Sequence, residues 1–163
     1  MTALGSEVER QRQRIREGAE VFVGESELRE RLAQALAQGR PLRVKLGMDP
    51  STPDLHLGHS VTLEKLRIFL ELGHTPIFLV GDFTARIGDP TGRNKTRPAL
   101  EADDVRRNAA TYVDQVRKVL DVDRAEVRYN SEWMDRMSPA SKTAASERRE
   151  VRRIILASAA LTL

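Results

Sequence analysis

Two histidines that flank a glycine are the residues of this chain best suited to chemistry. The segment His56-Leu57-Gly58-His59 lies where an apolar run, a proline-rich turn and a helical pattern follow one another. Free backbone N–H groups and the positive end of the helix dipole meet at such a corner. The imidazoles add side-chain donors, and Gly58 leaves the backbone open to close approach by a ligand. We interpret the corner as a site for the phosphates of a nucleotide.

Two further roles of the histidines stay open at this point. They could cap the helix or pack in the core, as single histidines commonly do. They could also bind a metal ion, but the loop adds only Asp49 and Asp54 as further ligands. We therefore expect no metal site.

The elements around this corner alternate between helix and strand. Apolar periodicity predicts helices over residues 6–23, 25–37, 59–72 and 100–120. Apolar runs predict strands over residues 42–48, 76–80 and 125–129. The alternation indicates an α/β fold, a Rossmann-like parallel sheet with flanking helices that is preceded by a helical segment.

Two loops follow predicted strands, at residues 47–59 and 81–97. Because parallel strands end at one edge of a sheet, we expect both loops to open there, where ligands bind. We expect three regions in all: an N-terminal helical segment over 1–40, the first half of the Rossmann-like domain over 41–137, and a divergent helical tail over 138–163.

Composition excludes several classes of function. The chain of 163 residues has no cysteine, which rules out disulfides, thiolate metal sites and cysteine nucleophiles. Its net charge is only +3, and the arginine runs near residues 10–16 and 148–153 are interpreted as solvated helix faces before RNA contacts. No apolar stretch approaches the ~20 residues of a membrane span, and no signal-peptide core is present. We expect a cytoplasmic protein without membrane association.

The two loops together resemble a known family. The segment from Asp49 to His59 resembles the HIGH signature of class I aminoacyl-tRNA synthetases. The segment over residues 81–93, with Lys95, Thr96 and Arg97 after it, is similar to the second loop of bacterial tyrosyl-tRNA synthetases. The resemblance covers residues 18–133, and it implies a sheet of the HUP type.

The resemblance implies tyrosine–tRNA ligase activity. The tyrosine carboxylate would attack the α-phosphate of ATP to give tyrosyl-adenylate, and the tyrosyl group would then move to tRNA(Tyr). ATP, as its magnesium complex, and L-tyrosine would be substrates, with no tightly bound cofactor. Members of the family are homodimers.

The same resemblance implies roles for individual residues. Catalytic contacts to the phosphates would come from Ser51, His56, His59, Arg93 and Arg97. ATP would be held by Gly47, Met48, Asp49, Gly58 and Thr62. The ammonium group of tyrosine would pair with Asp89, helped by Thr84.

Two departures from the family pattern stand out. Lys45 takes the place where many bacterial relatives have a tyrosine that hydrogen-bonds the substrate phenol, so the residue that recognises the hydroxyl is not evident. No further tyrosine pocket, KMSKS loop or anticodon-binding domain follows Pro139, and residues 141–163 do not resemble the family. We therefore expect a truncated fragment with about half an active site.

Three alternatives remain beside an active tyrosine–tRNA ligase fragment. One is a small adenylyltransferase of the same nucleotidyl-transferase superfamily, acting on phosphopantetheine or nicotinamide mononucleotide. Another is a tryptophanyl-tRNA synthetase, and the third is a truncated remnant without catalytic activity. The spacing from Asp49 to His59 and the loop over residues 81–97 favour the tyrosine enzyme over the first two.

Overall fold

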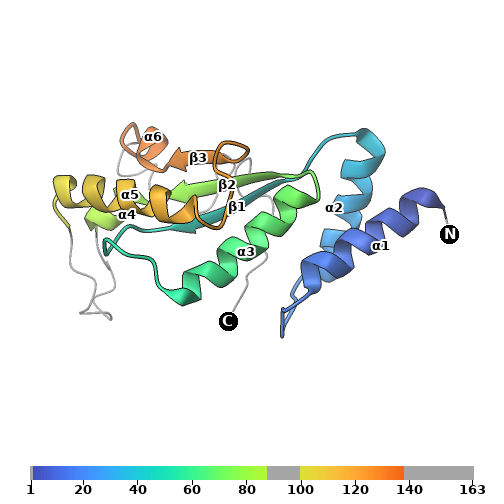
Figure 1. The fold of residues 1–163 in the computed structure, drawn as a ribbon. Helices are drawn as coiled ribbons and strands as arrows, with labels where there is room; N and C mark the ends of the chain where they lie inside the picture. The colour runs from blue at the N-terminus through green and yellow to red at the C-terminus, as the bar shows by residue number, and fades with distance from the viewer. Residues whose placement is uncertain (1, 88–99, 138–163) are drawn as a thin grey trace.

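The computed structural model describes residues 2–87 and 100–137, and a three-stranded parallel sheet lies at its centre (Figure 1). The strands are β1 (Arg43–Met48), β2 (Thr75–Val80) and β3 (Glu126–Tyr129), in the order β1-β2-β3. Val44 pairs with Pro76, and Phe78 pairs with Val127. The parallel α/β sheet expected from the alternation of elements is confirmed.

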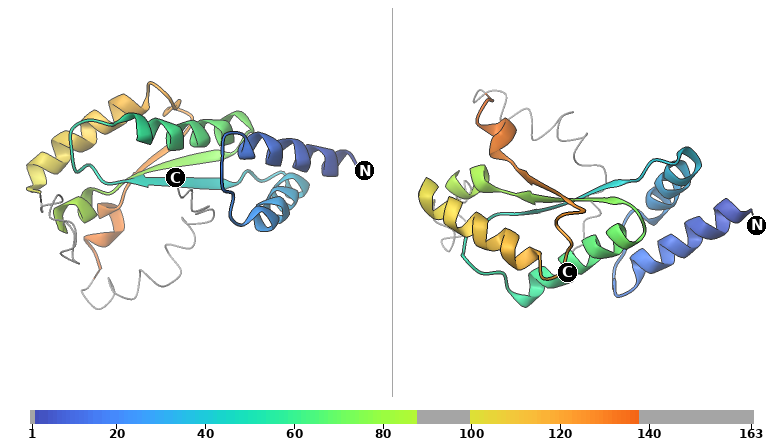
Figure 2. Two further views of the ribbon diagram at one scale, coloured as in Figure 1. Left: turned by 90° about the horizontal axis from the view of Figure 1, so that it is seen from below. Right: turned by 45° about the horizontal axis from the view of Figure 1, so that its top comes forward.

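The long crossover helices cover one face of the sheet. Helix α3 (Leu57–Glu71) connects β1 to β2, and α5 (Ala102–Val116) lies between β2 and β3 along the chain. Both lie on the same side of the sheet in the left view of Figure 2, with the short helices α4 (Asp82–Ile87) and α6 (Ser131–Met134) on the other side. Right-handed crossovers produce this arrangement when the strand order advances in one direction.

The hydrophobic core lies between the sheet and α3 and α5. Side chains alternate along each strand, so every second residue points toward these helices. The core residues from strands and helices include Val44, Met48, Phe78, Val80, Leu63, Leu66, Tyr112 and Val116. The intervening strand positions form the second sheet face, which carries Lys45, Gly47, Ile77, Leu79 and Arg128.

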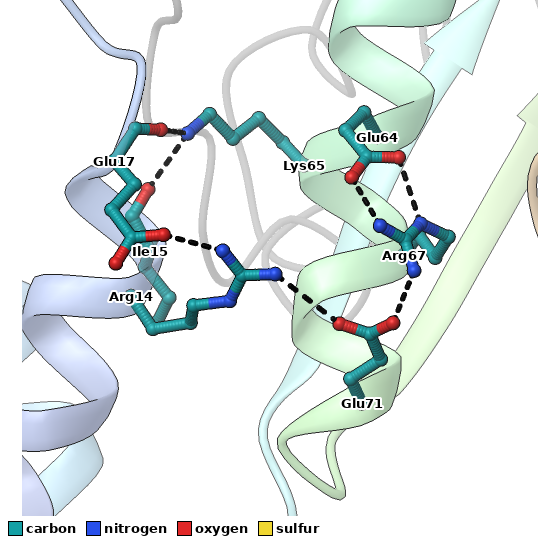
Figure 3. A network of polar contacts seen from close by, with 7 residues as sticks. All are labelled: Arg14, Ile15, Glu17, Glu64, Lys65, Arg67 and Glu71. Atoms are coloured by element: carbon teal, nitrogen blue, oxygen red, sulfur yellow. Dashed lines mark hydrogen bonds and ion pairs between the residues drawn. The ribbon is translucent and has the colours of Figure 1, made fainter.

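Two N-terminal helices, α1 (Ala3–Arg16) and α2 (Glu25–Gln38), precede the sheet and pack against each other. Lys65 of α3 anchors α1, because its ammonium group donates to the carbonyl oxygens of Ile15, at 3.1 Å, and Glu17 (Figure 3). The last carbonyls of a helix lack partners and carry the negative end of its dipole, so a cation is favourable there.

Several element boundaries differ from those expected. Helix α1 ends at Arg16 rather than residue 23, because the chain turns at Gly18, whose φ is 72°. Helix α3 begins at Leu57, two residues earlier than expected, and α5 is shorter than residues 100–120.

Helices α4 and α6 were not expected, and α4 lies in the segment predicted as a loop over residues 81–97. The remainder of that loop and the predicted tail lie outside the described residues. Within the described ranges, no helix is long and apolar enough to cross a membrane.

Candidate active site

The two histidines form a stacked pair at the start of α3, which we call the histidine corner, with Gly58 between them. His56 is the N-cap residue, and its ring centroid lies 3.8 Å from that of His59. The backbone N–H of His56 donates to Nδ1 of His59 at 3.2 Å. Because Nδ1 accepts this bond, the proton of a neutral His59 ring sits on Nε2. His59 can therefore offer an N–H donor to a ligand.

The histidine corner favours neutral imidazole at His59. Burial, together with the neighbouring His56, lowers the pKa of His59 below its ordinary value. Gly58 accommodates the stacking, since a Cβ there would lie 3.0 Å from Cε1 and Nδ1 of His56. The N–H of His59 already donates to the carbonyl of His56 at 2.9 Å, so the backbone donors at the start of α3 are those of Leu57 and Gly58. The corner can thus bind an anion through neutral donors and the helix dipole.

Helix α5 holds the loop that leads to this corner. The Asn108 side chain donates to the carbonyl of Pro50 at 3.1 Å, and Thr111 donates to that of Pro53. Gln115 donates to Pro53 at 2.9 Å and accepts from the N–H of Leu55 at 2.8 Å. We call Asn108, Thr111 and Gln115 the α5 polar row. Their spacing puts them on one helix face, a signal that could have revealed the row in the sequence.

A second group of polar contacts joins the ends of all three strands. The Thr84 hydroxyl in α4 donates to Oδ1 of Asp49, after β1, at 2.7 Å. Asn130, after β3, donates from Nδ2 to the Thr84 hydroxyl at 3.0 Å and accepts the N–H of Phe83 at 2.7 Å. We call Asp49, Thr84 and Asn130 the carboxyl-edge cluster. It places the start of the second loop at the same sheet edge as the end of β1.

Gly81 is required for the carboxyl-edge cluster. A Cβ on this buried glycine would lie 1.8 Å from Oδ1 of Asp49 and 2.6 Å from the Thr84 hydroxyl oxygen. Any side chain would therefore displace the carboxylate. Neither Gly81 nor Asn130 was among the expected site residues, although each directly follows a predicted strand, which is where ligand-binding residues of parallel sheets lie.

The described residues of the predicted site fall into two sets of contacts. His56, Gly58 and His59 meet at the corner, with Thr62 one turn further along α3, where its hydroxyl donates to the carbonyl of His59 at 2.9 Å. Asp49 and Thr84 meet at the sheet edge. The loop held by the α5 polar row, with the exposed Ser51, connects the two sets.

The remaining predicted residues divide between strand β1 and the part of the chain outside the described residues. Gly47 is exposed, whereas the Met48 side chain is buried in the core and its carbonyl accepts the N–H of Gly81 at 2.8 Å. Asp89, Arg93 and Arg97 lie outside the described residues. Over residues 2–87 and 100–137, no three acidic or histidine side chains gather closely enough to hold a metal ion.

Comparison with known proteins identifies the family. The family model described as tRNA synthetases class I (W and Y) matches residues 37–154. The chain belongs to this family. The match to the class I synthetase model continues past Trp133, where the recognisable motifs end, to residue 154. Membership sets aside the small adenylyltransferases as an alternative.

Relatives and solved structures agree with this membership. The chain is 51% identical over 149 residues to the tyrosine–tRNA ligase of Oleidesulfovibrio alaskensis, covering 91% of the chain and 36% of the relative. It is 46% identical over 152 residues to the tyrosine–tRNA ligase of Moorella thermoacetica, covering 93% of this chain and 37% of the relative. The chain thus spans about a third of the length of these curated class I synthetases.

Two solved structures share the fold. The tyrosyl-tRNA synthetase of Archaeoglobus fulgidus, complexed with L-tyrosine, is 24% identical with a TM-score of 0.65, over 87% of this chain and 41% of that one. The tyrosyl-tRNA synthetase of Aeropyrum pernix is 21% identical with a TM-score of 0.64, over 95% of this chain and 47% of that one. At these identities the likeness establishes the class I synthetase fold.

Proposed function

We propose that this chain provides the nucleotide corner and part of the amino-acid site of a tyrosine–tRNA ligase. The observation that carries the proposal is the 51% identity to a tyrosine–tRNA ligase over 149 of 163 residues, a match long enough to include both loops. The histidine corner and the carboxyl-edge cluster supply donors and a carboxylate suited to ATP and an amino acid. L-tyrosine, ATP as its magnesium complex and tRNA(Tyr) are the proposed substrates, and a homodimer is the proposed assembly.

The proposed reaction has two steps. A carboxylate oxygen of tyrosine attacks the α-phosphorus of ATP, the bond to the bridging oxygen breaks, and pyrophosphate leaves. A ribose hydroxyl at the end of tRNA(Tyr) then attacks the tyrosyl carbonyl, and AMP leaves. No covalent bond to the protein forms, so the chain acts by positioning the reactants and stabilising the charge that develops on phosphate.

The histidine corner is the proposed phosphate contact. The N–H on Nε2 of His59, the His56 ring and the first two N–H groups of α3 can donate to phosphate oxygens without any rearrangement. The Ser51 hydroxyl adds a donor from the loop. Gly47, Met48, Asp49, Gly58 and Thr62 line the proposed adenosine position along β1 and α3.

The carboxyl-edge cluster is the proposed binding position for the amino and carboxyl groups of tyrosine. Thr84 lies beside the proposed position of the tyrosine ammonium group. The roles of Asp89 toward the ammonium group, and of Arg93 and Arg97 toward the phosphates, rest on the sequence motif.

The test is tyrosine-dependent exchange between ATP and pyrophosphate. Residues 1–137 replace the matching segment of the Moorella thermoacetica ligase, and the chimera is assayed beside the parent enzyme and the 163-residue chain. We expect exchange by the chimera with tyrosine. His59→Ala should reduce it about 100-fold or more, as loss of a transition-state donor does.

The control is Lys118→Ala, a change at an exposed residue of the segment that follows α5, which should leave exchange unchanged. Exchange driven by tryptophan in place of tyrosine would assign the site to the other amino acid of the family. Absence of exchange in a folded chimera would contradict the proposal and support the non-catalytic remnant.

A further inference from the structure

Ser51 is an exposed residue whose backbone is fixed by its neighbours. The N–H of Ser51 donates to the carbonyl of Asp49 at 2.8 Å, which forms a tight turn. The Asp49 carboxylate accepts the Thr84 hydroxyl at 2.7 Å, which ties the turn to α4. The carbonyl of Pro50 accepts Nδ2 of Asn108 at 3.1 Å, which ties it to α5. These contacts set the direction in which the Ser51 side chain leaves the backbone.

Pro50 stiffens this turn. Its side chain is fully buried, at less than 2% exposure, and its ring fixes the backbone angle φ. Because this rigid residue lies directly before Ser51, a shift of the Pro50 carbonyl moves Ser51 with it. In the part of the chain that the structure describes, no group forms a hydrogen bond with the Ser51 hydroxyl. The hydroxyl is therefore available to donate to a ligand.

Asn108 differs from the other two residues of the α5 polar row. Those two bind residues of the loop that lie nearer to the histidine corner. Asn108 instead binds the residue directly before Ser51, and its hydrogen bond is partly buried. Water can replace a partly buried donor only incompletely, so loss of the amide would leave the Pro50 carbonyl poorly satisfied. The end of the turn at Ser51 thus depends on Asn108 in particular.

We propose that Asn108 is a positioning residue for the leaving pyrophosphate and acts through Ser51. Its amide fixes the Pro50 carbonyl, and this contact holds the Ser51 hydroxyl where it donates to a pyrophosphate oxygen. Asn108 itself touches no substrate. The inference rests on the proposed function and deepens it, because it assigns a role in the reaction to a residue of α5.

The precise position of this donor matters because of the charge that it meets. Pyrophosphate gains negative charge as the bond between the α-phosphorus and the bridging oxygen breaks. A donor that is already in place stabilises this charge without reorganisation, and a misplacement of about 1 Å can remove much of the effect. Without the Asn108 amide the turn can shift, so the Ser51 hydroxyl would stabilise the leaving group less. Tyrosine binding, at the carboxyl-edge cluster, would be unaffected.

A double-mutant cycle in the chimera tests whether Asn108 acts through Ser51. Asn108→Ala and Ser51→Ala should each slow exchange about 3- to 10-fold, with a higher KM for pyrophosphate and an unchanged KM for tyrosine. The double variant should be slower than Ser51→Ala by less than about 2-fold, because both changes remove the same contact. Losses that multiply in the double variant would overturn the proposal, and so would an equal rise of KM for tyrosine and pyrophosphate.

Two further variants separate the hydrogen bond from packing. Asn108→Asp keeps the shape of the side chain but replaces the amide donor by a carboxylate, so exchange should be at least as slow as with Asn108→Ala. Arg107→Ala, at the neighbouring exposed position of α5, is the matched control and should leave exchange unchanged. Full exchange by Asn108→Asp would show that the donor has no role and would overturn the proposal.

Binding of magnesium pyrophosphate to the chimera, measured by isothermal titration calorimetry, separates this proposal from the proposed function. We expect Kd to rise in the same non-additive pattern for the Asn108 and Ser51 variants. If the chimera exchanges with tyrosine but the two effects multiply, the role of Asn108 is wrong and the ligase assignment stands. If the chimera shows no exchange while the pattern in Kd is present, the ligase assignment fails and the positioning role stands. Absence of pyrophosphate binding to a folded chimera would overturn the positioning role.

Discussion

Gly81 and Gly58 lack side chains for different reasons at the two ends of the site. The position of a Gly81 side chain is filled by the Asp49 carboxylate, at 1.8 Å, within a cluster fixed by hydrogen bonds. The position of a Gly58 side chain meets only the exposed ring of His56, at 3.0 Å. A ring at the surface can rotate away, whereas the cluster cannot move without breaking its bonds.

This difference predicts that the two alanine variants affect different properties, stability for Gly81 and ATP binding for Gly58. Gly81→Ala should lower the free energy of unfolding by about 1 to 3 kcal/mol, as overpacking and the loss of a buried hydrogen bond do. Gly58→Ala should change it by less than about 1 kcal/mol, because alanine is favoured in a helix, but should weaken ATP binding at the corner. Urea denaturation followed by circular dichroism measures the first effect, and KM for ATP in exchange measures the second. Equal losses of stability would contradict this account.

At the scale of single residues, the sequence revealed local signals and missed distant ones. His56, Gly58 and His59 are recognisable because their chemistry depends on neighbours within one turn. Gly81 and Asn130 act through Asp49 and Thr84, which lie on other segments of the chain. Their importance follows from the packing of three strand ends, which no local spacing encodes.

Helix α5 contributes to the site as a support for the loop between β1 and α3. Gln115 satisfies both the N–H of Leu55 and the carbonyl of Pro53 with one amide. Asn108 and Thr111 continue these contacts along the same helix face. A helix that touches no proposed substrate thereby sets the path of the chain into the histidine corner.

Removal of the Gln115 amide should loosen this loop without unfolding the helix. Gln115→Ala should speed hydrogen exchange at the Leu55 amide by about 5- to 100-fold, since a partly buried bond of about 1 to 3 kcal/mol is lost. Asp114→Ala, at the neighbouring exposed position, is the control and should leave that amide unchanged. Unaltered exchange at Leu55 in the Gln115 variant would show that the loop is held by other contacts.

The strands and long helices were predictable because each carries a strong apolar signal. The run from Pro76 to Val80 is continuous, as expected for a strand covered on both faces, and only Leu79 in it is half-buried. Helix α4 was missed because Gly81 and Asp82 indicate a turn, and six residues are too few for a helical period to show. The start of α3 was placed late because His56 caps the helix through its backbone N–H and the His59 ring, an unusual capping pair.

His74 connects three parts of the molecule from a buried position. Its Nδ1 accepts the N–H of Leu42, just before β1, at 3.2 Å, and its Nε2 lies 3.1 Å from Oε1 of Gln11 in α1. A backbone N–H can only donate, so Nδ1 has to be unprotonated in the folded protein. Burial accordingly lowers the pKa of His74.

The whole protein should therefore lose stability as the pH falls below about 6.5, the ordinary value for histidine. The unfolded chain takes up the proton first, so the free energy of unfolding falls by up to about 1.4 kcal/mol per pH unit until the folded form also titrates. Urea denaturation between pH 7.5 and 5 measures the slope.

His74→Gln keeps a donor and an acceptor but cannot titrate in this range, so it should flatten the slope. His59→Gln should flatten it less, because His59 is less deeply buried and its hydrogen bond is nearer to solvent. An unchanged slope in the His74 variant would assign the pH dependence to other groups.

The strand order β1-β2-β3 also has a consequence for how the protein is made. The chain leaves the ribosome from its N-terminus, so β2 and β3 each emerge after a strand with which they pair. Helix α3 can cover β1 and β2 before β3 has been translated. Neighbouring strands of the sheet are consecutive in the chain, so the loops that close on pairing are shorter than they would be if a strand paired with a more distant one. Asn130 is the last of the three carboxyl-edge residues to be synthesised and directly follows β3, so that cluster can close only once all three strands have been translated.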